Sequence, residues 1–131
     1  MKAQNTFKAV ILVLFTFFLI SCSKNDDNDA VPNSQYQGTW SGSFSGAEDN
    51  GTWTADVNAS GIATGSATSV TFSNTYQLTG TVSAQGVFLA TVGTASTGAT
   101  FNGQMNPNGN GAGTWINTFE QMNGTWIGTK Q

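Results

Sequence analysis

The sequence predicts an all-β fold, an eight-stranded antiparallel up-and-down meander that closes into a small barrel. Three observations predict it. After residue 35, apolar and polar residues alternate with period two, no segment has the apolar spacing of a helix, and Gly-containing turn sequences separate the segments. Closure is expected because it removes unpaired sheet edges, and eight strands are about the smallest number that closes around side chains. A two-sheet β-sandwich is the structural alternative.

The first expected strand illustrates the alternation. Tyr36, Trp40 and Phe44 share one face, whereas Thr39 and Ser41 share the other. Later segments repeat this pattern with Thr, Ser and Asn on the polar face, which is typical of half-buried antiparallel strands. The expected strands are 36–45, 51–58, 61–67, 75–83, 86–93, 98–105, 110–119 and 123–130.

Turn sequences join these segments into successive hairpins. Three of them have Asn or Ser first and Gly fourth: Asn58-Ala59-Ser60-Gly61, Ser83-Ala84-Gln85-Gly86 and Asn106-Pro107-Asn108-Gly109. That pattern indicates type I turns in which the glycine takes a positive φ. Asn50-Gly51 and Asn123-Gly124 are hairpin signals and predict two further turns.

The tripeptide Gly-Thr-Trp occurs four times, on the first, second, seventh and eighth expected strands. Its tryptophans are Trp40, Trp53, Trp115 and Trp126. These strands become neighbours in a closed barrel, so the four indoles are expected on one stretch of wall. Two interpretations stay open. The indoles are core residues lying along a glycine-rich sheet, or they are an aromatic platform that binds sugar rings.

The strand directions assign the loops to two barrel ends. The three tight turns fall where the domain begins, and the other end, the distal rim, carries the longer loops 47–50, 68–74, 94–97 and 120–122. Scaffolds often gather functional loops at one end, so we expect a ligand at the distal rim. Glu48, Asp49 and Glu120 fall there and are candidate ligand-binding residues. Solvated charge is their simplest role, a weak Ca²⁺ site is an alternative, and no metal site is predicted.

Composition excludes most chemistries. The chain has no histidine and one cysteine, so the usual zinc sites and Ser-His-Asp or Cys-His catalysis lack their residues. Counted from Cys22, two lysines face seven acids, a net charge of −5, which argues against nucleic-acid binding. A two-carboxylate glycosidase survives this exclusion, and the domain offers Glu48, Asp49, Asp56 and Glu120 for it. We expect no enzyme, and no cofactor.

Cys22 ends the sequence Leu19-Ile20-Ser21-Cys22, which follows a lysine-containing start and the apolar run 9–20. This arrangement resembles a bacterial lipoprotein signal peptide with its lipobox. The resemblance implies that Cys22 is acylated, for example with palmitate, and becomes the first mature residue, anchored to a membrane. The apolar run is short of the roughly 20 residues that a transmembrane helix needs. An ordinary signal peptide with an incidental cysteine is the alternative.

Residues 23–29 are polar and acidic. They resemble the acid-rich segment that marks surface export in lipoproteins of the Bacteroidota, which implies a protein anchored in the outer membrane and displayed on the cell surface. A periplasm-facing lipoprotein is the alternative. The expected organisation is a signal peptide (1–21), a lipidated cysteine with an acidic flexible tether (22–34) and one β-domain (35–131).

The segments Ala59–Gly65 and 76–80, with the first Gly-Thr-Trp, resemble strands and turns of avidin-type barrels. The resemblance covers a minority of the domain and implies a barrel fold. It does not imply a biotin site, because the third strand ends Gly65-Ser66-Ala67-Thr68 without the tyrosine with which that family binds biotin. The family's late ligand-binding aspartate also has no counterpart after Asp56.

The sequence thus predicts a membrane-anchored, surface-displayed lipoprotein with a non-catalytic binding or interaction β-domain. Its expected partners are the membrane, through the lipid, and a glycan or protein at the distal loops. A small envelope inhibitor of a protease or lysozyme is one alternative, and the carboxylate-based glycosidase is the other.

Overall fold

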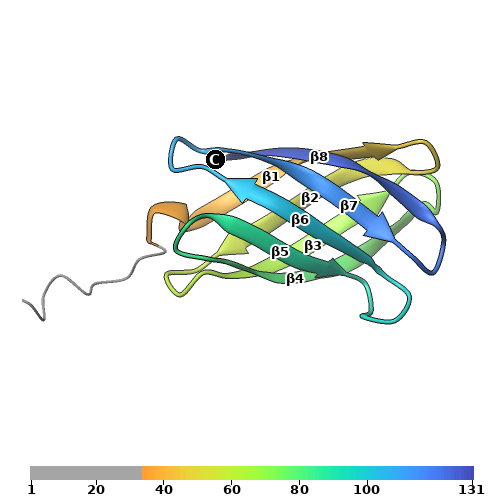
Figure 1. Ribbon diagram of the computed structural model, residues 1–131, viewed down its shortest axis with the longest axis horizontal. Helices are drawn as coiled ribbons and strands as arrows, with labels where there is room; N and C mark the ends of the chain where they lie inside the picture. The colour runs from red at the N-terminus through yellow and green to blue at the C-terminus, as the bar shows by residue number, and fades with distance from the viewer. Residues whose placement is uncertain (1–33) are drawn as a thin grey trace, which may run out of the picture. The chain divides into compact units, whose positions relative to one another are not determined.

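The computed structural model describes residues 34–131, all within one compact unit of the chain. Each strand pairs antiparallel with its neighbours in sequence, and β8 pairs with β1, which closes the barrel (Figure 1). The predicted meander barrel is therefore confirmed. The elements are η2 (Ser34–Tyr36), β1 (Gly38–Gly46), β2 (Asn50–Val57), β3 (Ile62–Ser69), β4 (Asn74–Val82), β5 (Val87–Val92), β6 (Ala99–Met105), β7 (Asn110–Asn117) and β8 (Met122–Lys130). The expected signal peptide (1–21), Cys22 and residues 23–33 of the expected tether lie outside the described residues.

The alternation that predicted the strands also defines the core. In β2, Trp53, Ala55 and Val57 are buried, whereas Thr54 and Asp56 between them are exposed. Every expected strand lies within two residues of an observed one. The start of β1 is shifted by two residues, because Tyr36 belongs to the 3-10 turn η2 and not to the strand, and the ends of β3 and β7 differ by the same amount.

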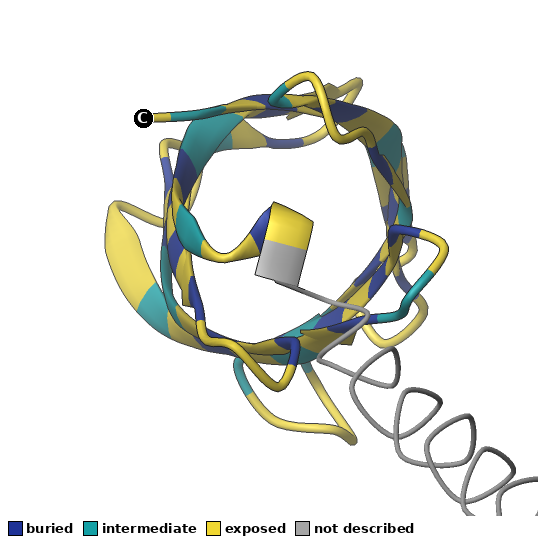
Figure 2. Cartoon of the chain, turned by 90° about the vertical axis from the view of Figure 1, so that its left-hand side faces the viewer, coloured by how far each residue is buried: buried dark blue, intermediate teal, exposed yellow. Residues whose placement is uncertain are grey.

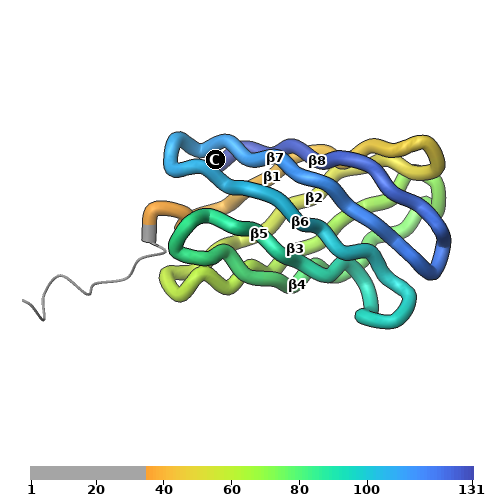
Figure 3. Tube along the Cα trace, in the orientation of Figure 1, coloured from red at the N-terminus to blue at the C-terminus, as the bar shows by residue number. Residues whose placement is uncertain are grey.

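The three tight turns form as predicted, at one end of the barrel (Figure 3). Their glycines Gly61, Gly86 and Gly109 have φ values of 81°, 83° and 95°. Each glycine N–H donates a hydrogen bond to the carbonyl of the first turn residue, with N–O distances of 3.0, 2.9 and 3.0 Å. The positive φ explains why glycine occupies the fourth position in all three turns.

The two Asn-Gly pairs do not form turns, so that prediction was wrong. They begin β2 and β8, and their glycines face the interior. A Cβ atom on Gly51 would lie 2.8 Å from the Phe44 ring, and one on Gly124 would lie 2.7 Å from the Trp115 indole nitrogen. Glycine is needed at both positions because an aromatic side chain lies directly over the backbone.

Three tryptophans lie across rows of glycines on adjacent strands. Trp53 on β2 is in register with Gly42 on β1, which is in register with Gly128 on β8. The indole N–H of Trp53 reaches past the middle strand and donates to the Ile127 carbonyl at 3.1 Å. The other rows are Trp126–Gly113–Gly103, ending on the Asn102 carbonyl, and Trp115–Gly124–Gly46, ending on the Ser45 carbonyl, with N–O distances of 3.2 Å in both.

One end of the barrel is filled by η2 and the start of β1. Figure 2 shows the turn inside the ring of strands at this end. Tyr36 is 2% exposed, and its carbonyl accepts a hydrogen bond of 2.8 Å from the indole N–H of the fully buried Trp40. The described chain therefore begins at a closed end, which we call the plugged end.

Candidate functional site

The opposite end of the barrel holds an open cavity of about 380 Å³, here called the distal cavity. Its inner end is an aromatic cluster on β1, β6 and β7. The Phe44 ring packs edge-on against Phe101 and Trp115, with ring centroids 5.7 and 5.6 Å apart. All three side chains are buried and line the cavity, so an apolar floor is already formed.

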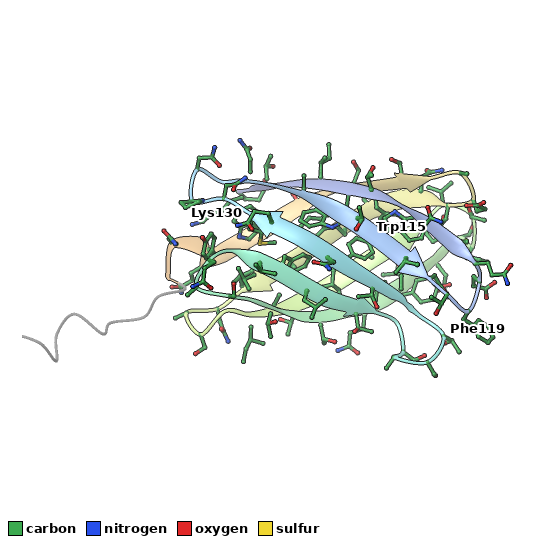
Figure 4. All side chains as sticks on the ribbon, viewed as in Figure 1. Trp115, Phe119 and Lys130 are labelled. Carbon is green, nitrogen blue, oxygen red and sulfur yellow. The ribbon has the colours of Figure 1, made fainter. Side chains whose placement is uncertain are left out.

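Strand ends and loops complete the cavity. The apolar wall residues are Ala67, Tyr76, Val92, Ala99 and Met122. At the mouth, Phe72 of the β3–β4 loop and Phe119 of the β7–β8 loop line the cavity while remaining 45% and 64% exposed. Figure 4 shows Phe119 at the tip of its loop. Two aromatic rings thus lie at the entrance of the distal cavity, whose walls are apolar.

Asp49 holds two of the distal loops together. It is only 5% exposed, and its Oδ1 accepts hydrogen bonds from the backbone N–H groups of Asn50 (2.8 Å) and Thr71 (3.2 Å) and from Ser69 Oγ (2.8 Å). Ser69 Oγ in turn accepts from the Phe72 N–H at 3.0 Å. The carboxylate therefore fixes the loop that carries one of the two rings at the mouth.

Asn117 holds the β5–β6 loop and the β7–β8 loop together. It is 8% exposed, its Nδ2 donates to the Thr97 carbonyl at 3.1 Å, and its Oδ1 accepts from the Glu120 N–H at 2.9 Å. Asn117 and Ser69 were not predicted as site residues. A signal for them exists, because each is a polar residue at the inward-facing position that ends a strand, two residues beyond Trp115 and Ala67.

The four predicted tryptophans do not form an exposed platform. Trp40, Trp53, Trp115 and Trp126 are at most 3% exposed, because they occupy inward positions on their strands. Three of them are core residues outside the cavity lining, and only Trp115 reaches it. Stacking of a surface-bound sugar on Trp40, Trp53 and Trp126 is therefore excluded by their burial.

The three predicted acidic residues lie at the distal end but have different surroundings. Asp49 and Glu120 line the cavity, whereas Glu48 is exposed, lies outside the lining, and contributes its backbone carbonyl to Thr71 Oγ1 at 2.9 Å. Within residues 34–131, no three His, Cys, Asp or Glu side chains are grouped so that they could hold a metal ion. The Ca²⁺ alternative therefore lacks a group of three carboxylates in the described residues.

Comparison of the chain with protein-family models, with curated proteins and with solved structures gives no match. In the part of the chain that the structure describes, no helix has the length and apolar character needed to cross a membrane.

Proposed function

We propose that this protein is a lipid-anchored, non-catalytic binding protein that takes a small molecule into its distal cavity. The observation that carries the proposal is the cavity itself, closed at the bottom by aromatic rings and open to solvent at the loops. Its volume of about 380 Å³ lies within the range of roughly 300–1,000 Å³ that is usual for small-molecule sites. Barrel mouths are a common location for such sites.

Two further observations support the proposal, one for a preformed site and one for a non-catalytic role. Asp49 and Asn117 are buried and join the four distal loops in pairs through hydrogen bonds. A cavity whose loops are already fixed loses little conformational entropy when a ligand enters. The absence of histidine from the sequence, with Asp49 engaged by three donors, supports a non-catalytic role.

The proposal also includes the location of the protein, which we place in the outer membrane with display at the cell surface. The sequence around Cys22 supports the lipid anchor, and the acidic residues 23–29 support surface display. The described chain begins at the plugged end of the barrel. A tether attached there leaves the open end free, so the ligand would enter on the side remote from the anchor. This arrangement makes the protein suited to capturing a molecule from the surrounding medium.

The binding proposal is tested with a neutral aromatic probe, naphthylethanol, observed by saturation-transfer NMR on the purified protein. We expect transfer to the naphthyl protons in the wild type and its loss in Ala99→Phe, because the new ring fills the cavity that Ala99 lines. The matched control is Ala112→Phe, an exposed position on β7 outside the lining, which should retain transfer. No transfer in the wild type, or equal transfer in Ala99→Phe, would contradict the proposal.

The anchor is tested by Cys22→Ser. We expect the wild type to fractionate with membranes and to be cleaved by protease added to intact cells, and the variant to leave the membrane fraction. A variant that stays with the membranes would contradict lipid anchoring. Protection of the wild type from added protease would favour the periplasm-facing alternative.

A further inference from the structure

The charged side chains of the barrel are unequally distributed between its two ends. Asp49 and Glu120 line the distal cavity and Glu48 lies on the adjacent loop. Asp56, one residue before the end of β2, and Lys130, the one cation within residues 34–131, lie toward the opposite end. There Lys130 Nζ donates to the Gln35 carbonyl at 3.3 Å. Figure 4 shows Lys130 and Phe119 at opposite ends of the molecule. A cleft with charge of one sign and apolar walls focuses its field on an entering ligand, so this cavity attracts cations and repels anions.

The second oxygen of Asp49 offers a specific contact. All hydrogen bonds to this side chain that involve described residues end on Oδ1, and Oδ2 takes none. Asp49 is only 5% exposed, and it lines the cavity. No buried side-chain nitrogen or oxygen atom in the described residues lacks a hydrogen-bond partner, so Oδ2 is accessible to solvent. It can therefore accept a hydrogen bond from a ligand bearing N–H groups.

The apolar surface of the cavity defines the rest of the ligand. Phe44, Phe101 and Trp115 form the floor, and Phe72 and Phe119 stand at the mouth. Flat rings pack well against such a surface, and the faces of aromatic rings attract an ammonium group. A ligand with a flat apolar ring and a cationic N–H group therefore complements both the aromatic and the acidic residues of the lining.

We infer that the distal cavity binds a small arylalkylamine, with its ring on the aromatic floor and its ammonium group directed to Asp49 and Glu120. This inference rests on the proposed function, since it specifies the ligand class of the same cavity. It also predicts discrimination, because a carboxylate in place of the ammonium would face two acidic side chains with no cation nearby.

The test compares three probes that share a naphthyl ring and a two-carbon arm: naphthylethylamine, naphthylethanol and naphthylacetate. Titration calorimetry at low ionic strength and neutral pH should give affinities in the order amine, alcohol, acetate, with the amine about tenfold or more tighter than the acetate. Equal affinity of amine and acetate would overturn the inference and leave the proposed function standing. Binding of none of the three would overturn both.

Matched variants locate the effect in the cavity. Asp49→Asn and Glu120→Gln should each weaken amine binding severalfold while leaving the alcohol within about twofold. Glu48→Gln removes the same charge from the same end but lies outside the lining, so amine affinity should change by less than about twofold. If Glu48→Gln lowers the affinity for naphthylethylamine as much as Glu120→Gln does, the preference for a cationic ligand is a property of the whole rim. The inference is then wrong.

Asp49→Asn keeps the Oδ1 acceptor, but its loops could be loosened by the change. A thermal melt of each variant therefore accompanies the titrations. If Asp49→Asn does not fold, the comparison of Glu120→Gln with Glu48→Gln decides the inference, because Glu120 and Glu48 are both exposed and neither carboxylate makes a hydrogen bond with a described residue.

Discussion

The two halves of the barrel contain the same kind of aromatic cluster, but only one cluster is covered. Near the plugged end, Trp53, Phe88 and Trp126 pack with ring centroids 5.4–5.9 Å apart, and Trp40 and Tyr36 close the barrel at that end. In the distal half, the cluster of Phe44, Phe101 and Trp115 has open space above it. The same kind of aromatic packing stabilises one half of the barrel and forms the floor of the proposed binding site in the other.

The loops that connect the strands also differ between the two ends of the barrel. At the plugged end, the turns are short and their positive φ values belong to glycines. At the distal end, Ser73 and Gln121 adopt positive φ values of 49° and 55° without being glycine, in the two loops that carry Phe72 and Phe119. Backbone strain is therefore confined to the end proposed to bind a ligand, as is common at functional sites.

The largest expected effect comes from breaking the covered cluster. Trp126→Ala should lower the free energy of unfolding by about 3–5 kcal/mol, because it leaves a cavity in a packed core. Phe119→Ala, at the open end, should change it by less than about 0.5 kcal/mol, since the ring is already exposed. Denaturant unfolding measures both. Similar losses in the two variants would show that the halves do not differ in packing as described.

Removing part of the plug tests whether the two ends are independent. Tyr36→Ala should lower the free energy of unfolding by about 3 kcal/mol, as for other buried aromatic truncations, while the affinity for naphthylethylamine at the distal cavity stays within about twofold. Calorimetry below the unfolding transition gives the second value. A large loss of affinity in the folded variant would mean that the plug shapes the cavity.

Removing an aromatic ring at the mouth of the distal cavity tests the open end of the barrel. Phe119→Ala should weaken naphthylethylamine binding by about threefold to tenfold, which corresponds to losing one aromatic contact. Ile116→Ala, an exposed apolar position on β7 outside the cavity, is the matched control and should bind as the wild type does. Unchanged affinity in Phe119→Ala would remove this ring from the site.

The smallest expected effect concerns backbone strain in the distal loops. Gln121→Asn should raise the free energy of unfolding by about 0.5 kcal/mol, because asparagine tolerates positive φ better than glutamine. Gln85→Asn, in a tight turn where φ is not positive, should give no such gain. Equal melting temperatures for Gln121→Asn and the wild type would argue against strain at this position.

The fold was predictable because its two determinants are local. Alternation with period two and the Asn/Ser-x-x-Gly turns require only neighbouring residues, and both were confirmed. The glycines of the Asn-Gly pairs misled the prediction because glycine has two uses. Gly51 and Gly124 allow aromatic rings of another strand to lie over the backbone, a requirement that depends on register across the barrel and is invisible along the chain.

The position of the site was partly predictable from strand direction, which brought Asp49 and Glu120 to one end. The cavity itself was not predictable, since it depends on which side chains the closed barrel brings together, among them the small residues Ala67 and Ala99 in its lining. The roles of Ser69 and Asn117 were missed because isolated polar residues at strand ends are usually solvated. Only their burial in the closed barrel identifies them as loop anchors.

The central claim, a filled half and an open ligand-binding half, is tested most directly by the four indole N–H signals in an NMR titration with naphthylethylamine. Single Trp→Phe variants assign the signals. We predict that the Trp115 signal shifts on titration, while those of Trp40, Trp53 and Trp126 stay in place, because only Trp115 lines the cavity. Saturating shifts of Trp53 and Trp126 as large as that of Trp115, or no shift of Trp115, would contradict the account.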